Sequence, residues 1–211
     1  VIVAVVVPYL GIGRLNVWAC LAVLLSGWVI LGLIRDLQQR TRGVTDVRTF
    51  MRRLTPSYLG MFTAHFGFAL TITGAVFVTQ FSAERDLRME AGDSVSLNNY
   101  SFTLEEVIVV EGPNYSADRG VFSVTLDGEM FTTMMPEKRR YVASGQIMTE
   151  AAIDAGVMRD LYLALGEPLG DGAWSVRVQH KPMIRWIWFG ALLLGLGGLT
   201  TSLDRRYRRG R

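Results

Sequence analysis

A single uncharged stretch, Tyr58 to Phe81, constrains what this chain can fold into more than any other part of it. A helix needs about 20 apolar residues to cross the hydrocarbon core of a bilayer, and this stretch meets that length. It carries one imidazole, His65, which lies roughly 12 Å from the polar start at Ser57 at a helical rise of about 1.5 Å per residue. An ionisable side chain at that depth needs a partner, so the sequence predicts a membrane helix with a candidate site at His65.

The surroundings of His65 allow two interpretations. Small residues repeat along one side of the predicted helix and would let another backbone, or a flat ligand, come close. They are Gly60, Ala64, Gly67, Thr71 and Gly74. The side chains one turn from the histidine are apolar, which suits the edge of a macrocycle as well as a packed helix surface. They are Met61, Phe62, Phe68 and Ala69. Helix packing is the commoner role of such a stripe of small residues.

The composition and two further apolar runs indicate several membrane helices. Of the 211 residues 50% are hydrophobic, and the mean hydropathy is +0.26, which is too apolar for an ordinary soluble domain of this size. Residues 15–34 and 183–203 are long enough to span, whereas residues 1–10 are too short. We therefore expect residues 1–10 to be the end of a truncated transmembrane helix in the tail of a longer multi-pass protein. The only cysteine, Cys20, lies in the first full span, so no intrachain disulfide can form.

The arginines predict how these helices are oriented. The segment 35–57 has six arginines against two aspartates, a net charge of plus four, and the tail 204–211 has five arginines. Short arginine-rich segments stay on the cytoplasmic side, so both are expected there, and neither is interpreted as a nucleic-acid patch. Residues 82–182 then lie on the far side of the membrane, which in a bacterium is the periplasm. That segment has sixteen acids against nine bases, a net charge of minus seven.

The segment 82–182 is expected to be β structure. Asn98-Asn99 and Asp127-Gly128 are turn signals between alternating runs, and the second is a strong hairpin signal. The run Val107 to Val110 is typical of a buried strand, and further strands are expected at 161–165 and 174–179. Within this segment, apolar residues have a helix-like spacing only around Thr149 to Ala155, where a helix is therefore expected. The chain is therefore expected to combine transmembrane α-helices with an inserted all-β domain, either a small barrel or a sandwich.

Several side chains of this domain belong to types that can bind ligands or metals. His180 is expected to be exposed and structurally neutral, with axial ligation on the external face as the alternative. Lys138 to Arg140 are expected in a solvated loop, although they could meet an acidic partner or a haem propionate. Met130, Met134 and Met135 are better explained as a flexible apolar surface or as core filler than as iron ligands, and Glu105-Glu106 as surface acids. The sequence has no CxxC, HExxH, GxSxG or phosphate-binding loop, and no residue is assigned as catalytic.

Longer sequence words carry a family resemblance. The stretch MTEAAIDAGVMRDLYLALGEPL at residues 148–169 and the words KPMIRWIW at 181–188 and GMFTAHFGFALTITG at 60–74 closely resemble the haem lyase family of bacterial cytochrome c maturation, CcmF and its relatives. The tail DRRYRR resembles it as well. The likeness covers the chain from about Leu15 onward.

This resemblance implies a multi-pass protein of the bacterial inner membrane that helps attach haem to apocytochromes c in the periplasm. It further implies a b-type haem held in the membrane between two histidines, with His65 at the position of one axial ligand to the iron. Haem-chaperone, thiol-reductase and apocytochrome c partners follow from the same resemblance. The family's tryptophan-rich external segment, its external histidines and its second membrane histidine are absent from this chain, which could hold one side of one haem, so whether it is itself an enzyme is left open.

Two other functions remain as alternatives. A non-enzymatic, membrane-anchored module would use its periplasmic β domain to bind a protein or peptide, with His65 as a packing residue. A transporter fragment agrees less well, because the sequence has no broken helices or paired membrane charges.

Overall fold

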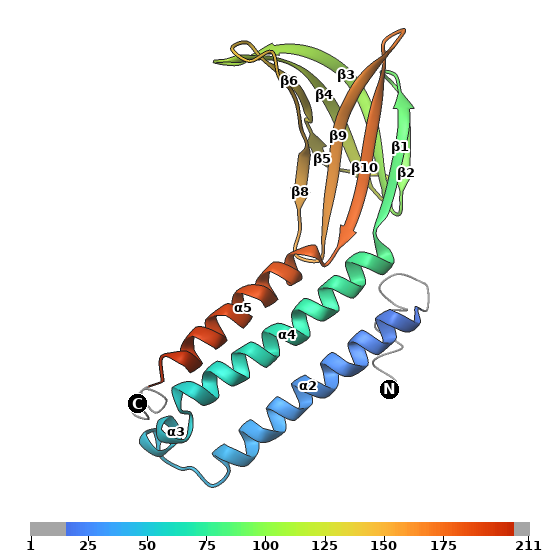
Figure 1. Cartoon of the computed structure of the whole chain (residues 1–211). Coiled ribbons are helices and arrows are strands. Elements are labelled where there is room, and N and C mark those ends of the chain that lie inside the picture. Colours follow the sequence, from blue (N-terminus) through green and yellow to red (C-terminus); the bar gives the residue numbers. More distant parts are fainter. Residues whose placement is uncertain (1–15, 205–211) are drawn as a thin grey trace. The chain divides into compact units, whose positions relative to one another are not determined.

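The computed structural model describes residues 16–204 and divides them into two compact units, one helical and one of β structure (Figure 1). The β unit, Ser82–Pro182, is inserted in the sequence between two helices of the helical unit. The expected helix end at residues 1–10 and the arginines of the tail lie outside the described residues. The helices are α2 (Val17–Thr41), α3 (Val47–Arg53), α4 (Pro56–Phe81) and α5 (Ile184–Ser202).

Among the described residues, the three helices α2, α4 and α5 are long and apolar enough to cross a membrane. Helix α4 lies between the other two (Figure 1). The small residues of α4 form its contact with α5: a Cβ added at Gly67 would lie 2.6 Å from the carbonyl oxygen of Gly190, and one added at Gly60 would lie 2.6 Å from that of Gly197. Two glycine pairs thus bring the two backbones together.

Hydroxyl groups and one amide pair connect α4 to α2. Ser26 donates to the carbonyl oxygen of Ala69 at 3.1 Å, and Thr73 donates to the Ser26 hydroxyl at 2.8 Å. Asn16, which caps the start of α2, also donates from its amide to Gln80 at 2.9 Å. Helix α4 therefore uses opposite sides for its two neighbours: the side of Gly60 and Gly67 for α5, and the side of Ala69 and Thr73 for α2.

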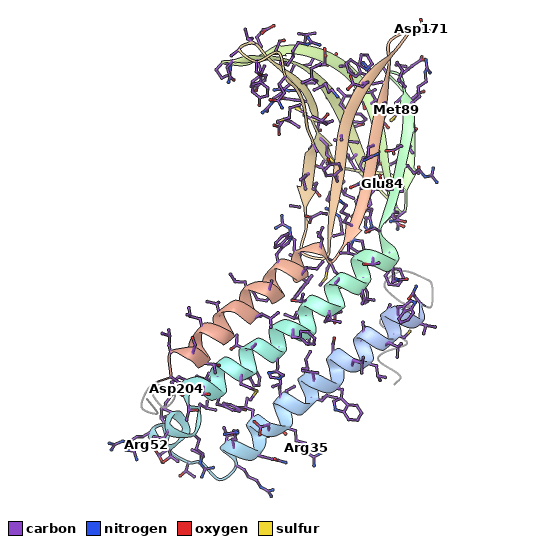
Figure 2. The ribbon with its side chains drawn as sticks, viewed as in Figure 1. Arg35, Arg52, Glu84, Met89, Asp171 and Asp204 are labelled. Atoms are coloured by element: carbon purple, nitrogen blue, oxygen red, sulfur yellow. The ribbon has the colours of Figure 1, made fainter. Side chains whose placement is uncertain are left out.

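The arginine-rich segment 35–57, expected as the cytoplasmic loop between two spans, is mostly helical. Helix α2 continues to Thr41, where an ion pair of 3.0 Å between Asp36 and Arg40 supports its last turns, and α3 follows. At the same end of the helical unit, Asp204 accepts a hydrogen bond of 3.0 Å from the backbone of Ser57 and so caps the first turn of α4 (Figure 2).

The β unit is a sandwich of two antiparallel sheets. One sheet has the strand order β1-β10-β9-β8, and the other has the order β2-β3-β4-β6-β7, with β5 also paired to β4. The strands are β1 (Ala83–Met89), β2 (Ser94–Leu97), β3 (Tyr100–Glu111), β4 (Tyr115–Leu126), β5 (Glu129–Met134), β6 (Glu137–Tyr141), β7 (Ile147–Glu150), β8 (Ala152–Ala155), β9 (Arg159–Gly170) and β10 (Ala173–Pro182). Of the two expected architectures, the sandwich is thus the one observed.

Alternating apolar side chains from both sheets form one core. Its fully buried members include Phe102 and Phe122 from one sheet and Leu163 and Val176 from the other. Both predicted turns are confirmed: Asn98 has φ 55°, and Asp127 and Gly128 have φ 51° and 89°, the left-handed values that a tight hairpin requires.

Two expectations about the β unit were wrong. Thr149 to Ala155 is not helical but forms strand β7 and strand β8, whose backbones pair with β6 and β9, so tertiary pairing overrides the local period. The run Val107 to Val110 is a strand but is not buried, since Val109 is 72% exposed. A β-bulge between Leu104 and Glu106 shifts the register, and β3 then continues past the stretch that β2 covers.

Candidate functional site

His65 lies within α4, and its ring makes one hydrogen bond with the helix itself. Nδ1 lies 2.9 Å from the carbonyl oxygen of Met61. Because a carbonyl oxygen can only accept, Nδ1 must carry the proton in this contact. The neutral ring then keeps its lone pair on Nε2, the form in which histidine binds metals. The contact with Met61 therefore assigns the Nδ1–H tautomer to His65. The sequence alone did not predict this tautomer.

The flank of α4 that carries His65 faces neither α2 nor α5. Met61, Phe68 and Ile72 follow the same flank at helical spacing, and Phe68 and Ile72 are 52% and 38% exposed. The stripe of small residues beside this flank packs against α5 and is therefore not a wall for a ligand. An exposed imidazole on an apolar flank fits the edge and face of a macrocycle.

The described residues include no cluster of three or more histidine, cysteine or acidic side chains that could hold a metal ion. Within residues 16–204, His65 is therefore not part of a multi-ligand metal cluster. A haem iron takes one axial ligand from each side of the ring, and the free Nε2 of His65 could serve as one of the two. The other ligand would have to come from outside this part of the chain.

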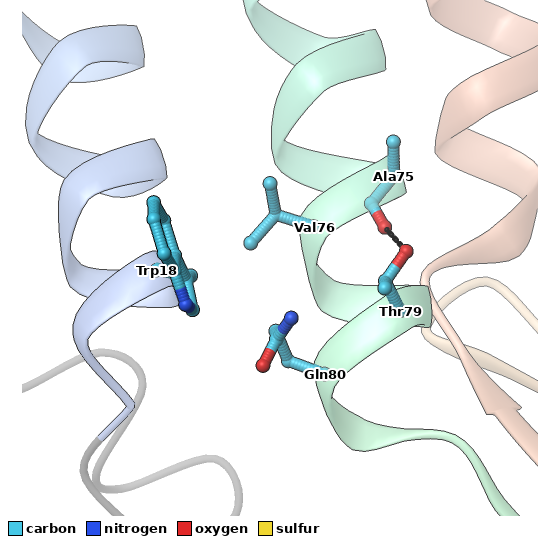
Figure 3. Close-up of a pocket in the computed structure, with 5 residues that line it drawn as sticks. All are labelled: Trp18, Ala75, Val76, Thr79 and Gln80. Atoms are coloured by element: carbon cyan, nitrogen blue, oxygen red, sulfur yellow. Dashed lines mark hydrogen bonds between the residues drawn. The ribbon is translucent and has the colours of Figure 1, made fainter.

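A small pocket lies further along α4, towards Phe81 (Figure 3). It is lined by Trp18 of α2 and by Ala75, Val76, Thr79 and Gln80 of α4. These α4 residues are roughly 15 to 22 Å from His65 along the helix, at about 1.5 Å per residue. The pocket is thus separate from the imidazole, and the Asn16–Gln80 hydrogen bond beside it had no recognisable signal in the sequence.

His180 is half-buried, so the expectation of an exposed histidine was wrong. Its ring lies 6.0 Å from that of Tyr100, a residue of the opposite sheet, and its Nδ1 is buried without a hydrogen bond among the described residues. Burial lowers the pKa of His180, and the positive charge of Arg159 lowers it further. These effects favour a neutral ring that is packed within the sandwich.

The bases Lys138 to Arg140 lie on strand β6, and not in the solvated loop that was expected. Lys138 forms an ion pair of 2.6 Å with Glu167, and Arg139 one of 2.7 Å with Glu137. Two of the three bases are thus used within the β unit. Met134 is buried in the core, whereas Met130 and Met135 are exposed, which agrees with their assignment as filler and surface.

Glu137 connects two arginines across neighbouring strands. Its side chain is 8% exposed and lies 2.5 Å from Arg119 and 2.7 Å from Arg139. Burial by itself raises the pKa of Glu137, but the hydrogen bonds from Arg139 and Arg119 outweigh it and leave the pKa below its usual value. The carboxylate therefore stabilises the folded sandwich most when it is ionised.

We expect Glu137→Gln to destabilise the β unit by about 1–3 kcal/mol at neutral pH, because two charged hydrogen bonds are weakened and the arginines face each other. A depressed folded-state pKa gives stability that is present above the unfolded-state pKa and lost as pH falls through the folded-state value. The difference between the two proteins should therefore shrink in acid. Denaturant unfolding followed by circular dichroism measures it, with Glu150→Gln as the control, since Glu150 is 42% exposed and 3.5 Å from Arg139. A constant difference across pH would contradict this account.

These features define a class: an integral membrane protein with a β-sandwich inserted between two of its spanning helices. The family described as the CcmF C-terminal beta-sandwich matches residues 80–182. The chain is 54% identical to the cytochrome c-type biogenesis protein CcmF of Pseudomonas aeruginosa over 90% of its length, and 42% identical to that of Escherichia coli over 99%. It belongs to the CcmF family.

The chain spans only about a third of its relatives' length. It covers 29% of the Pseudomonas aeruginosa protein and 31% of that from Escherichia coli. A solved structure titled cytochrome c heme lyase CcmF has the same fold, with a TM-score of 0.70 and 16% identity over 96% of this chain and 33% of that one. The chain therefore corresponds to the C-terminal part of such proteins.

Proposed function

We propose that this chain supplies His65 as one axial ligand to a b-type haem in a bacterial inner membrane, within a protein that attaches haem to apocytochrome c. The observation that carries this proposal is the fixed tautomer: Nδ1 bonded to the carbonyl of Met61, and Nε2 left as the nitrogen with a lone pair. The names of the relatives, cytochrome c-type biogenesis proteins, support the same assignment.

The residues around His65 have defined parts in this proposal. A haem with two imidazole ligands transfers electrons and leaves no open position for oxygen. The carbonyl of Met61 fixes the orientation of the ring and makes Nε2 a better donor, as partners of metal-bound histidines do. The side chains of Phe68 and Ile72, on the same flank, would exclude water from the face of the macrocycle.

In this proposal the β-sandwich is a periplasmic docking surface for haem-chaperone, thiol-reductase or apocytochrome c partners. Its side of the membrane follows from the arginines of 35–57. Exposed apolar side chains support a docking role, since Val109, Val142 and Ile147 are 72%, 78% and 51% exposed. The same observation favours the second candidate, a membrane-anchored binding module without haem.

Replacing His65 by alanine in the full-length protein distinguishes the two candidates. We expect the purified variant to lose the absorption bands of its membrane haem and to make little mature cytochrome c. Leu59→Ala is the matched control, because Leu59 is 43% exposed on the same helix and about 120° around it from His65. An unchanged haem spectrum together with unchanged cytochrome c output would refute the ligand role and favour the binding module.

A further inference from the structure

The turn between β8 and β9 presents two large apolar side chains at its tip. It consists of Gly156, Val157 and Met158, and the last two are 70% and 62% exposed. Turns at the surface of a soluble domain are usually polar. Two exposed aliphatic side chains at a turn tip therefore indicate a surface that meets an apolar environment.

The strand register places this turn at one particular end of the β unit. Arg159, the first residue of β9, pairs with Pro182, the last residue of β10, and α5 begins at Ile184. At the same end, Ala83 pairs with His180 and follows α4, which ends at Phe81. The turn thus projects beyond the last strand pair at the end where the chain continues into both membrane helices. Figure 1 shows the ends of β8, β9 and β10 together at this end of the sheet.

Both junctions with the membrane helices are very short. A single residue, Ser82, separates α4 from β1, and Met183 alone separates β10 from α5. Trp186 and Trp188 follow within the first turns of α5, and Trp188 is 74% exposed. Tryptophan is enriched where a membrane helix crosses the interface. The lipid interface therefore begins within a few residues of Pro182, the residue that pairs with the base of the turn.

The turn is held in one shape by Arg159. The backbone N–H of Gly156 donates to the carbonyl oxygen of Arg159 at 2.9 Å, and a Cβ at Gly156 would lie 2.7 Å from that oxygen. The guanidinium pairs with the carboxylate of Asp154 and donates to the hydroxyl of Tyr100 at 2.8 Å. It also lies 5.0 Å from the ring of Phe131. The positive charge is therefore neutralised inside the sandwich and does not oppose an apolar environment at the tip.

Two other turns close this end of the β unit. The turns Asn98-Asn99 and Asp127-Gly128 lie at the same end, because Asn99 donates to Asp127 at 2.8 Å and the ring of the neighbouring Tyr100 lies 6.0 Å from that of His180. Both turns are polar and suit water. Lipid is the apolar phase that surrounds spanning helices. The β8–β9 turn is the apolar one among these three turns, and it lies at the end where the chain continues into α5.

We propose that the β8–β9 turn is an interfacial anchor, which inserts Val157 and Met158 into the boundary between headgroups and acyl chains of the bilayer. Interfacial elements insert their apolar side chains to this shallow depth. The anchor does not depend on haem or on His65.

Spin-label accessibility tests this anchor. In the chain with Cys20→Ala, reconstituted in nanodiscs of phosphatidylethanolamine and phosphatidylglycerol, a nitroxide is attached at Met158→Cys. The matched control is Leu169→Cys, which is 53% exposed and lies beside Asp171 at the opposite end of the β unit (Figure 2). We expect the ratio of oxygen to nickel-chelate accessibility to be several-fold higher at residue 158 than at residue 169, because oxygen concentrates in lipid and the chelate stays in water.

Two outcomes would overturn the anchor. If the label at residue 158 is as accessible to the nickel chelate as the control label, the turn lies in water. If it is inaccessible to both reagents, protein covers the turn instead of lipid. Val157→Cys provides a second position for the same measurement, and circular dichroism of each labelled chain verifies that the sandwich is folded.

Discussion

Introducing leucine at Gly67 is expected to separate α4 from α5. A side chain at this position would begin 2.6 Å from the carbonyl oxygen of Gly190, 2.8 Å from the Cβ of Leu193 and 2.9 Å from the backbone nitrogen of Leu194. All three atoms belong to the backbone or the first side-chain carbon of α5, so none can move without the helix. Over-packing of this kind costs about 1–3 kcal/mol, and more when a whole helix must shift.

Gly195→Leu is the matched control for this prediction. Gly195 lies in α5, the partner helix, and a Cβ there has no neighbour within 4 Å among the described residues. Both substitutions gain the same helix propensity of about 1 kcal/mol, so the difference between them reports the packing alone. We expect Gly67→Leu to unfold at a lower denaturant concentration in micelles, as measured by tryptophan fluorescence. Equal stability of the two variants would show that the glycines do not determine the approach of the helices.

The stripe of small residues on α4 shows which part of the helix packing could be predicted from the sequence and which part could not. Its spacing predicted a close approach on one side of α4, and the structure confirms that approach. Spacing within one helix does not identify what approaches, because a flat ligand and a second backbone require the same groove. Only Gly190 and Gly197, which lie more than a hundred residues further along the chain, identify the neighbour as α5.

The β unit was predictable where the signal was local. The turn at Asp127-Gly128 follows from the backbone freedom of its own residues, and it was predicted correctly. His180 was placed wrongly because its burial depends on Tyr100, a residue of the other sheet that is distant in sequence. The exposure of Val109 likewise depends on a bulge and on the short length of β2, neither of which changes the local apolar pattern.

The strongest test of the candidate site removes the imidazole of His65 by substitution and then supplies free imidazole in solution. If His65 binds the proposed b-type haem, His65→Gly in the full-length protein is expected to lose the absorption bands of that haem and to regain them when imidazole is added. The glycine leaves free the space of the missing imidazole ring, and the carbonyl of Met61 remains available to accept a hydrogen bond from the added imidazole. Addition of imidazole to the His65→Ala protein should restore less, because the alanine methyl group occupies part of the space.

The hydrogen bond to Met61 can be tested with a second ligand. 1-Methylimidazole binds iron through its free nitrogen but has no N–H to donate, so it should restore the spectrum at a higher concentration than imidazole does. A net hydrogen bond contributes about 0.5–1.5 kcal/mol, which corresponds to roughly 2- to 10-fold in the concentration needed. Equal concentrations for the two ligands would mean that the Met61 carbonyl has no part in orienting the ring. A His65→Gly protein that keeps its haem spectrum without any added ligand would remove His65 from the coordination of the iron altogether.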